Sequence, residues 1–242
     1  MKDIHSHLLP GIDDGCTDFD ESIALLKELE KKGVTEIVLT PHYIKNSKFT
    51  CNKDEKKKIY NKLIKKVKEN NIDIKLYLGN EIYLDDDILD LLEKKEIETI
   101  NNSKYLLIEF PMFTYQATAL NIFDELIHKG YKIILAHPER YPYVVDDIHL
   151  LDKYKDMGVL FQGNYESLYD KYGKQSRKTL KKLLKMGYIS FLASDTHHTI
   201  NLDIKKLKRK LRWYISKNEI NNLLEGNFDK VINNIDVGDK NV

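Results

Sequence analysis

The sequence predicts an α/β fold in which parallel β-strands alternate with α-helices. Short runs rich in β-branched and aromatic residues recur along the 242-residue chain, and amphipathic helical patterns fill the intervals between them. Strands separated by helices pair in parallel, so seven such units indicate a β/α barrel or a wide open sheet. No Pro- or Ser-rich linker divides the chain, so we expect one domain over residues 1–225 and a loose C-terminal tail over residues 226–242.

The expected elements follow one another in regular order. Strands are predicted at residues 2–5, 36–40, 74–79, 105–109, 132–136, 159–162 and 189–193. Helices are predicted at residues 20–32, 53–70, 85–94, 117–129, 147–157, 176–186 and 204–216. The first helix illustrates the pattern, because Ile23, Leu26 and Leu29 recur at helical spacing and Gly33 ends the helix.

The composition excludes several classes of protein. Lys and Arg number 39 against 38 Asp and Glu, which gives a net charge of +1, and 42% of the residues are hydrophobic. This balance suits a folded, water-soluble chain and offers no electrostatic footprint for nucleic acid. No apolar run reaches the ~20 residues that span a bilayer, and residues 1–7 lack a signal-peptide core, so we expect no membrane insertion and a cytoplasmic location. The Lys-rich stretches at 56–58 and 205–212 are expected to form solvated helix faces.

The two cysteines, Cys16 and Cys51, do not suit a phosphatase with a cysteine nucleophile. Such an enzyme needs an arginine six positions after the cysteine to hold the phosphate, whereas Ser22 and Lys57 occupy those positions. Two cysteines also form no disulfide framework, which fits a reducing compartment. A Gly-rich loop ending in Gly-Lys-Ser or Gly-Lys-Thr is absent as well, so a chain that handles phosphate must use other groups.

Side chains that commonly bind metals follow almost every predicted strand. They are His5 and His7 after the first, His42 after the second, Glu81 after the third, Glu109 ending the fourth, His137 after the fifth, and Asp195 and His197 after the seventh, with Asp13 and Asp14 in the first loop. In a β/α barrel the carboxyl ends of all strands face one mouth, where these side chains would meet. His5 and His7 are two residues apart, so both point to one side of an extended chain and can share an ion.

The donor set indicates more than one ion. Imidazoles mixed with carboxylates, without a thiolate, favour a hard to borderline divalent metal such as Mn, Fe or Zn. Without Asp13 these side chains make nine candidate ligands, which exceed what one ion takes, so we expect two or three ions, with Glu81 or Glu109 as the bridging carboxylate. Such a site makes hydroxide near neutral pH and clamps the attacking and leaving oxygens of a phosphoryl transfer. The other histidines, His128, His149 and His198, are expected on the surface.

Arg140 is the candidate for holding a phosphate. It follows His137 by three residues and is one of four arginines in a Lys-rich chain. A guanidinium grips a phosphate with two parallel hydrogen bonds, which a lysine cannot do; the alternative is an ordinary salt bridge with Glu139 or Asp146. Aromatic residues near the same strand ends either form a rim that stacks on an aromatic substrate or serve as packing residues: Tyr43, Tyr83, Phe113, Tyr141, Tyr143 and Tyr165.

Five motifs together resemble the polymerase and histidinol phosphatase (PHP) superfamily. They are DIHSHLLPGIDDG at residues 3–15, TPHY at 40–43, GNE at 79–81, LAHPERY at 135–141 and ASDTH at 193–197. Within that superfamily they are most similar to the bacterial manganese-dependent tyrosine-protein phosphatases of capsule and exopolysaccharide loci. The match runs in order from residue 3 to about 215, and the first motif together with His-Pro-Glu-Arg is highly specific.

The resemblance implies a distorted seven-stranded β/α barrel with up to three metal ions, manganese being favoured over iron or zinc. One ion would take His5, His7, Glu81 and Asp195, a second Glu81, Glu109 and His137, and a third Asp14, His42 and His197. Arg140 matches the family's phosphate-binding arginine, and His42 or Asp14 is the candidate general acid.

The resemblance also implies the reaction, which is one-step hydrolysis of phosphotyrosine by a metal-activated hydroxide without a phosphoenzyme. The implied substrate is a phosphotyrosine protein, namely a bacterial tyrosine kinase that controls capsule or exopolysaccharide synthesis. One alternative is another reaction on the same scaffold, either a small-molecule phosphatase of the histidinol phosphatase type or a phosphodiesterase. A second is a non-catalytic, metal-stabilised regulatory module, against which the filled ligand positions argue.

Overall fold

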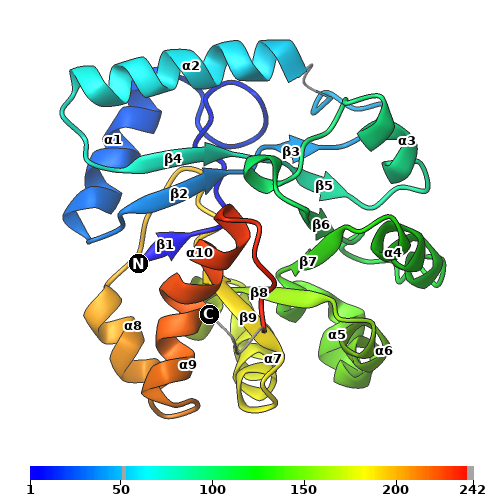
Figure 1. Ribbon diagram of the computed structural model, residues 1–242. Helices are drawn as coiled ribbons and strands as arrows, with labels where there is room; N and C mark the ends of the chain where they lie inside the picture. The colour runs from blue at the N-terminus through cyan, green and yellow to red at the C-terminus, as the bar shows by residue number, and fades with distance from the viewer. Residues whose placement is uncertain (51–52, 239–242) are drawn as a thin grey trace.

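Parallel strands form a ring that carries helices on its outside (Figure 1). In the computed structural model, which describes residues 1–50 and 53–238, the strands belong to two sheets ordered β1-β2-β4 and β3-β5-β6-β7-β8-β9. Every pairing within them is parallel. The strands are β1 Lys2–Asp3, β2 Glu36–Leu39, β3 His42–Tyr43, β4 Lys75–Leu78, β5 Glu81–Tyr83, β6 Tyr105–Glu109, β7 Lys132–Ala136, β8 Leu160–Asn164 and β9 Ile189–Ala193. The predicted α/β fold with parallel strands is confirmed.

The helices are α1 Phe19–Lys31, α2 Lys53–Glu69, α3 Ile88–Glu93, α4 Ala119–His128, α5 Pro142–Asp146, α6 Asp152–Asp156, α7 Gly173–Lys185, α8 Ile204–Leu211, α9 Lys217–Asn221 and α10 Asn227–Ile232. Helices α1 to α7 lie between the strands, and α8, α9 and α10 follow the last strand. Shorter helical turns are η1 Ile100–Asn102, η2 Pro138–Arg140, η3 Ile148–Leu151, η4 Tyr165–Tyr169 and η5 Asn222–Gly226. Within the described ranges, none of the helices has the length and apolarity needed to cross a membrane.

Two short strands, β3 and β5, were not predicted. Each follows a longer strand after a two-residue break, at Thr40 and Pro41 for β3 and at Gly79 and Asn80 for β5. Across the breaks the ladder continues, because the Gly79 amide donates to Leu39 O at 2.9 Å and the Glu81 amide to Pro41 O at 3.2 Å. The backbone therefore stays extended up to the residues that carry candidate ligands.

A cluster of buried, mostly apolar residues lies inside the ring. It consists of Ile4, Val38, Tyr77, Ile100, Tyr105, Leu107, Ile134, Ala136, Phe191, Ala193, Phe228 and Val231. The last two belong to α10, which lies over the centre of the ring in Figure 1. The prediction of a loose tail from Gly226 is therefore wrong for residues 227–232, because burial of Phe228 and Val231 anchors α10 to the strands.

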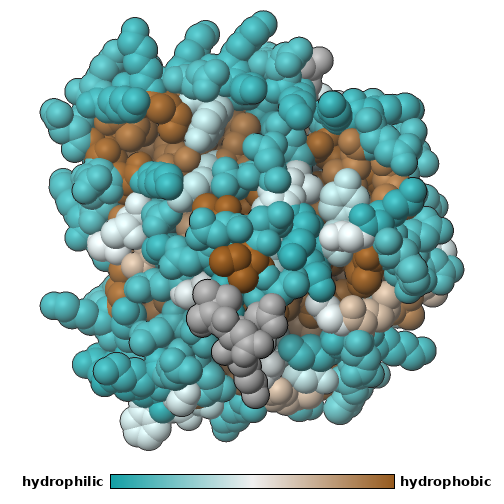
Figure 2. All heavy atoms as spheres, in the orientation of Figure 1, coloured by the Kyte–Doolittle hydropathy of each residue, from teal (hydrophilic) through white to brown (hydrophobic). Residues whose placement is uncertain are grey.

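The Lys-rich stretches behave differently from each other. The face shown in Figure 2 is largely hydrophilic, with hydrophobic residues in separate patches. Lys205, Lys206 and Arg209 are exposed, as predicted for the stretch at 205–212. Lys56, in contrast, is 1% exposed, because its Nζ donates to Asn80 Oδ1 at 2.6 Å and pairs with Glu98 at 2.8 Å. The expectation of a solvated face is therefore wrong at this one residue of the 56–58 stretch.

Candidate metal centre and phosphate site

The side chains predicted to bind metals meet at the carboxyl ends of the strands. Their donor atoms form three groups, and within each group the atoms all lie within 4.8 Å of one another. The groups are His5-His7-Glu81, His42-Glu81-Glu109 and His7-Asp14-His42-His197. Asp195 and His137 border these groups and complete the nine predicted residues. The structure thus brings all nine together, from seven separate strand ends and loops.

The first group is the most compact and the most buried. His5 Nε2 and His7 Nε2 each lie 3.3 Å from Glu81 Oε2, and the two nitrogens are 3.1 Å apart. Asp195 Oδ1 lies 3.6 Å from His5 Nε2 and 3.3 Å from His7 Nε2. Two imidazoles and two carboxylates thus present one atom each to a common point, which suits a single four-coordinate ion.

Glu81 joins the first group to the second. While its Oε2 faces His5 and His7, its Oε1 lies 3.0 Å from His137 Nε2. Glu109 Oε1 lies 3.6 Å from the same nitrogen, and His42 Nδ1 lies 3.0 Å from Glu81 Oε2. Glu81 is therefore placed as a bridging carboxylate would be, between two donor groups.

The third group lies nearer the solvent. Asp14 Oδ1 is 3.6 Å from His42 Nε2 and 3.5 Å from His197 Nε2. The Asp14 side chain is 54% exposed and that of His42 is 12% exposed. His42 offers one ring nitrogen to each of two groups, and the rings of His7 and His197 stack with centroids 4.0 Å apart.

The charges of the cluster fit dications. Glu81 Oε2 and His42 Nδ1 are buried and lie 3.0 Å apart without the alignment of a hydrogen bond, and neither atom has another hydrogen-bond partner among the described residues. Burial opposes a charged imidazole, yet the carboxylates of Glu81 and Asp195 raise the pKa of His5 to about 9. Burial and the nearby Glu81 carboxylate raise the pKa of Glu109 to about 8. Buried anions without enough partners favour cations between them, so these residues fit divalent ions.

Two side chains behind the cluster set the tautomers of His5 and His7. Gln162 Oε1 lies 2.7 Å from His5 Nδ1, and Asp13 Oδ2 lies 2.7 Å from His7 Nδ1. Amide and carboxylate oxygens only accept hydrogen bonds, so each Nδ1 donates, and Nε2 is the ring nitrogen left to bind an ion. Asp13, which the sequence grouped with the candidate ligands, thus lies behind one of them. No such role was predicted for Gln162.

Arg140 is linked to the cluster through Asp195. Its Nη1 donates to Asp195 Oδ2 at 2.7 Å, and the Asn164 side-chain amide donates to the same oxygen at 2.8 Å. The guanidinium also lies over the Tyr172 ring, 4.4 Å from its centroid. Its partner is therefore neither Glu139 nor Asp146, the two carboxylates weighed from the sequence. With a side chain 23% exposed, Arg140 faces the mouth rather than the bulk solvent.

The backbone at the site is locally strained. His137 has φ 31° and Asp195 φ 51°, left-handed values that L-residues adopt at a cost and that cluster at functional sites. The loop after His7 also folds back tightly, since a Cβ at Gly15 would lie 2.0 Å from the His7 carbonyl oxygen. Glycine at position 15 therefore allows the loop to hold Asp13 and Asp14 against the histidines.

A buried lysine network positions the strand ends and was missed by sequence reasoning. Lys56 holds Asn80 Oδ1, and Asn80 Nδ2 donates to Pro41 O at 3.1 Å. These contacts tie together the two strand breaks that precede His42 and Glu81. A lysine in a polar helical pattern gives no sign of such burial, although the adjacent break at Gly79 and Asn80 is visible in the sequence.

The remaining sequence predictions have mixed outcomes. Tyr141 and Tyr165 are 0% exposed and Tyr43 is 5% exposed, so these three are packing residues rather than a substrate rim. Phe113, in contrast, is 84% exposed on the loop after β6. His128, His149 and His198 are exposed, as predicted.

Cys16 is consistent with the absence of a cysteine nucleophile. The residue is buried, and burial raises the pKa of its thiol to about 12, so it stays protonated. Cys51 lies outside the described residues.

Comparison with known proteins points to one family. The family model described as "Capsular polysaccharide synthesis, CpsB/CapC" matches residues 1–233. CapC of Staphylococcus aureus is 38% identical to this chain, over 90% of this chain and 87% of its own length. The tyrosine-protein phosphatase YwqE of Bacillus subtilis is 31% identical, over 82% of this chain and 78% of its own. The tyrosine-protein phosphatase CpsB of Streptococcus pneumoniae is 35% identical over 84% of each chain.

Solved structures agree. A crystal structure from work on YwqE from Bacillus subtilis and CpsB from Streptococcus pneumoniae, described there as unique metal-dependent tyrosine phosphatases, has a TM-score of 0.87. It is 27% identical in sequence and covers 98% of this chain and 96% of its own. The phosphotriesterase homology protein of Escherichia coli shares the fold alone, with a TM-score of 0.58 at 12% identity over 96% and 98% of the two chains. The chain belongs to the CpsB/CapC family of capsular polysaccharide synthesis.

Proposed function

We propose that this protein is a metal-dependent phosphatase that hydrolyses phosphotyrosine in proteins. The observation that carries the proposal is that one side chain, Asp195, contacts both the candidate metal ligands and the candidate phosphate-binding arginine. Asp195 presents Oδ1 to His5 and His7, and its Oδ2 accepts from Arg140. A phosphate held by Arg140 would thus lie beside the candidate metal centre. The relatives YwqE and CpsB, which are named tyrosine-protein phosphatases, support the same reaction.

Two or three divalent ions, manganese being favoured over iron or zinc, are proposed for the nine donors. Their partition follows the geometry: His5, His7, Glu81 and Asp195 for one ion, Glu81, Glu109 and His137 with His42 for a second, and Asp14, His42 and His197 with His7 for a third. When bound, such ions activate water and neutralise charge on a transferring phosphoryl group.

The chain's own side chains bind and orient the substrate. The Arg140 fork can bind two phosphate oxygens, and Asp195 and the Tyr172 ring hold that fork in place. His42 and Asp14 border the open side of the cluster. The hydrogen bond with His197 lowers the pKa of Asp14 to about 2, so His42, when an ion leaves one of its ring nitrogens free, is the better candidate to give a proton to the leaving tyrosine oxygen. A phenolate with a pKa of about 10 is a moderate leaving group, so a strong acid is not required.

We also propose that the two sheets act as one closed barrel of seven strand positions. β2 and β3 share one position and β4 and β5 another, each pair separated only by a two-residue break. The residues that follow β1 and β9 join the two sheets. The His7 amide donates to Thr196 O at 2.9 Å, and the Asp195 amide donates to His5 O at 3.0 Å. Closure of this kind would bring His5 and His7 beside Asp195.

The cellular role is proposed from the family. Membership in a capsular polysaccharide synthesis family supports a phosphotyrosine protein of that process as substrate, with a bacterial tyrosine kinase as the expected partner and the cytoplasm as the expected location of this protein. A histidinol-phosphatase-like or phosphodiesterase reaction on the same scaffold is the second candidate. A non-catalytic metal-stabilised module is less well supported, since the cluster retains all nine donors.

Substrate comparison tests the proposal. Purified protein is assayed with Mn²⁺ on a phosphotyrosine peptide, histidinol phosphate and a dinucleotide, before and after chelation. We expect turnover of the phosphotyrosine peptide that disappears on chelation and returns with Mn²⁺. Activity that survives full chelation would contradict the metal-dependent mechanism, and a higher kcat/KM for histidinol phosphate would favour the second candidate.

A further inference from the structure

A band of positive charge runs along α7 and α8. Residues 173–213 contain twelve Lys and Arg against two Asp, although the whole chain sums to only +1. The buried residues of the two helices are leucines with one serine and one threonine, and no lysine of either helix is among them. We call the following residues the cationic strip: Lys171, Arg177, Lys181, Lys185, Lys206 and Lys210.

Tyrosine rings organise the strip. Lys206 and Lys210 lie 5.3 and 4.0 Å from the centroid of the Tyr169 ring. Lys181 and Lys185 lie 5.7 and 5.8 Å from that of Tyr214. Each ring thus holds two ammonium groups, which orders side chains that would otherwise move freely.

Lys210 shows how closely the charges are packed. Burial and then the neighbouring charges of Lys181 and Arg177 lower the pKa of Lys210. Like charges gathered this closely repel one another, and an anion that binds among them relieves the repulsion.

Few acids of the protein neutralise the strip. Ion pairs join Lys171 to Glu166 and Arg177 to Asp170. Over residues 1–50 and 53–238, no ion pair joins a carboxylate to the other four members of the strip, Lys181, Lys185, Lys206 and Lys210. The strip therefore keeps uncompensated positive charge that complements an acidic ligand.

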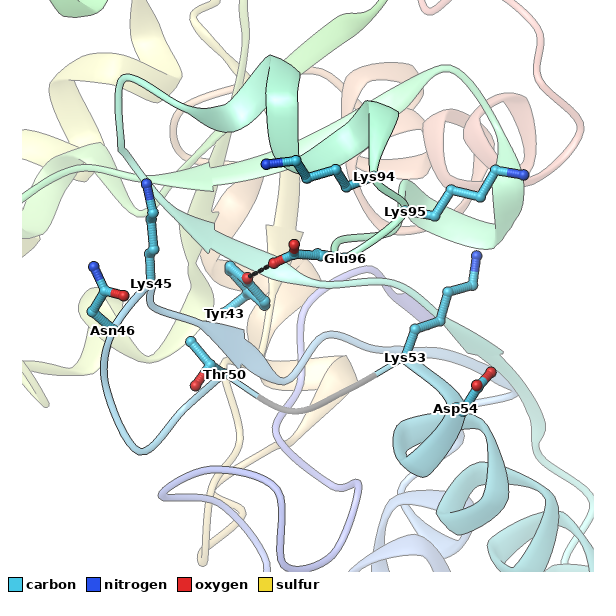
Figure 3. A pocket seen from close by; sticks show the side chains of 9 residues that line it. All are labelled: Tyr43, Lys45, Asn46, Thr50, Lys53, Asp54, Lys94, Lys95 and Glu96. Atoms are coloured by element: carbon cyan, nitrogen blue, oxygen red, sulfur yellow. Dashed lines mark hydrogen bonds between the residues drawn. The ribbon is translucent and has the colours of Figure 1, made fainter.

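A second lysine-rich surface provides a contrast. It is a hollow of about 780 Å³ beside Tyr43, whose hydroxyl donates to Glu96 (Figure 3). Three of its lysines have acidic partners: Lys45 pairs with Asp87, Lys53 with Glu98 and Lys94 with Asp90. Both surfaces are rich in lysine, but acidic partners neutralise most of the positive charge at the hollow and little of it at the strip.

The strip begins at the candidate phosphate site. Tyr172 is the residue before α7. The centroid of its ring lies 5.4 Å from Lys171 Nζ and 4.4 Å from the Arg140 guanidinium. A chain lying along the strip would therefore approach Arg140 with one end. Because the apolar faces of α7 and α8 are buried, they have no stripe to insert into a lipid surface, which favours a polypeptide as the ligand.

We propose that the cationic strip docks an acidic segment of the substrate protein, while a phosphotyrosine of that substrate occupies the site at Arg140. The proposal rests on the proposed phosphatase function and adds the chemistry of the substrate. Docking outside the reacting centre lowers KM for acidic substrates and leaves the chemical step unchanged.

A charge-reversal variant tests the strip. Lys181→Glu, Lys185→Glu and Lys206→Glu are combined, and Lys58→Glu, Lys62→Glu and Lys68→Glu on α2 form the matched control. Two phosphotyrosine peptides are compared, one with a run of Glu beside the phosphotyrosine and one with Gln at the same positions. We expect the strip variant to lose about tenfold in kcat/KM on the Glu peptide, through KM, with the Gln peptide unaffected. Equal losses in strip and control variants would overturn the proposal.

A binding measurement separates the strip from catalysis. Fluorescence anisotropy with the unphosphorylated Glu peptide needs no turnover, so it reports on docking even if neither phosphotyrosine peptide is hydrolysed. Binding to the Glu peptide should weaken with added salt and in the strip variant but not in the control. The milder pair Lys185→Gln and Lys206→Gln, both at exposed positions, repeats the test if the triple variant is unfolded. Loss of binding to phosphatidylglycerol vesicles, with Glu-peptide binding unchanged, would assign the strip to lipid and overturn the proposal.

Discussion

The ring of strands encloses two contrasting regions, an apolar floor that includes Phe228 and Val231 of α10 and a charged mouth that holds the nine candidate ligands. One strand supplies both. In β6, Tyr105 and Leu107 belong to the floor, and Glu109 follows at the same two-residue spacing in the mouth. The period of two in a β-strand thus delivers a packed core and a reactive site from one element.

The two regions differ in how well their groups are satisfied. Floor side chains pack against one another, with Tyr105 and Leu107 0–1% exposed, so they stabilise the fold. In the mouth, Glu81 Oε2 and His42 Nδ1 are buried without hydrogen-bond partners among the described residues, which costs stability. Variants of the mouth should therefore change turnover more than stability, and variants of the floor should do the reverse.

Glu81→Gln should have the largest effect on turnover. Glu81 lies in two of the three donor groups, so the neutral amide removes a charge that both share. Loss of several kcal/mol of charge stabilisation corresponds to a decrease of about 10³-fold in turnover. The measurement is Mn²⁺-dependent hydrolysis of a phosphotyrosine peptide, with thermal unfolding of the metal-free variant as the control. Turnover within about tenfold of wild type would place Glu81 outside the centre.

Arg140→Ala should follow, with a loss of about 10²-fold in kcat/KM, because a preorganised donor to the phosphate disappears. Arg140→Lys keeps the charge but loses the planar fork, so it should recover only part of the activity. Arg212→Ala removes an exposed arginine and is the matched control. Similar losses in the Arg140 and Arg212 variants would remove Arg140 from the phosphate site.

Gln162→Ala should act on metal binding rather than on the chemical step. The amide holds His5 Nδ1 at 2.7 Å, and loss of such a supporting contact typically weakens metal affinity 10–100-fold. The Mn²⁺ concentration for half-maximal turnover should rise by about that factor, and excess Mn²⁺ should restore most of the rate. Gln175→Ala, at an exposed position of α7, serves as control. An unchanged Mn²⁺ requirement would count against the role given to Gln162.

Phe228→Ala should have the smallest effect on turnover and a large one on stability. Phe228 is 2% exposed in the floor, and emptying such a position costs about 3–5 kcal/mol of unfolding free energy. Trp213→Ala removes a side chain that is 81% exposed, so it should change stability by no more than about 0.5 kcal/mol. Urea denaturation measures both variants. A Phe228 variant as stable as wild type would show that α10 does not secure the floor.

The sequence predicted strands best where apolar runs were long and clearly bounded. The strands at 105–109, 132–136 and 189–193 were predicted to the residue, because each continuous apolar run ends at a polar or ligand side chain. β3 and β5 are two and three residues long and depend on pairing rather than on pattern, so no periodicity marked them. α10 was missed because Phe228 and Val231 become core residues only when the ring already exists to receive them.

Candidate ligands were visible in the sequence because each is chemically distinctive and follows a strand. Their supports were not, since Gln162, Asn164 and Lys56 are ordinary polar residues whose role comes from tertiary contacts. One signal was available. β8 is the strand whose end carries no imidazole or carboxylate, and its Gln162 and Asn164 occupy the same two-residue spacing as the ligands elsewhere.

Metal reconstitution tests the central claim most directly. Chelated protein is titrated with Mn²⁺ while metal content and phosphotyrosine turnover are measured on the same samples. The cluster of nine donors predicts no turnover without metal, followed by a rise that saturates at two to three ions per chain. Full turnover in protein shown to contain no metal would contradict the account.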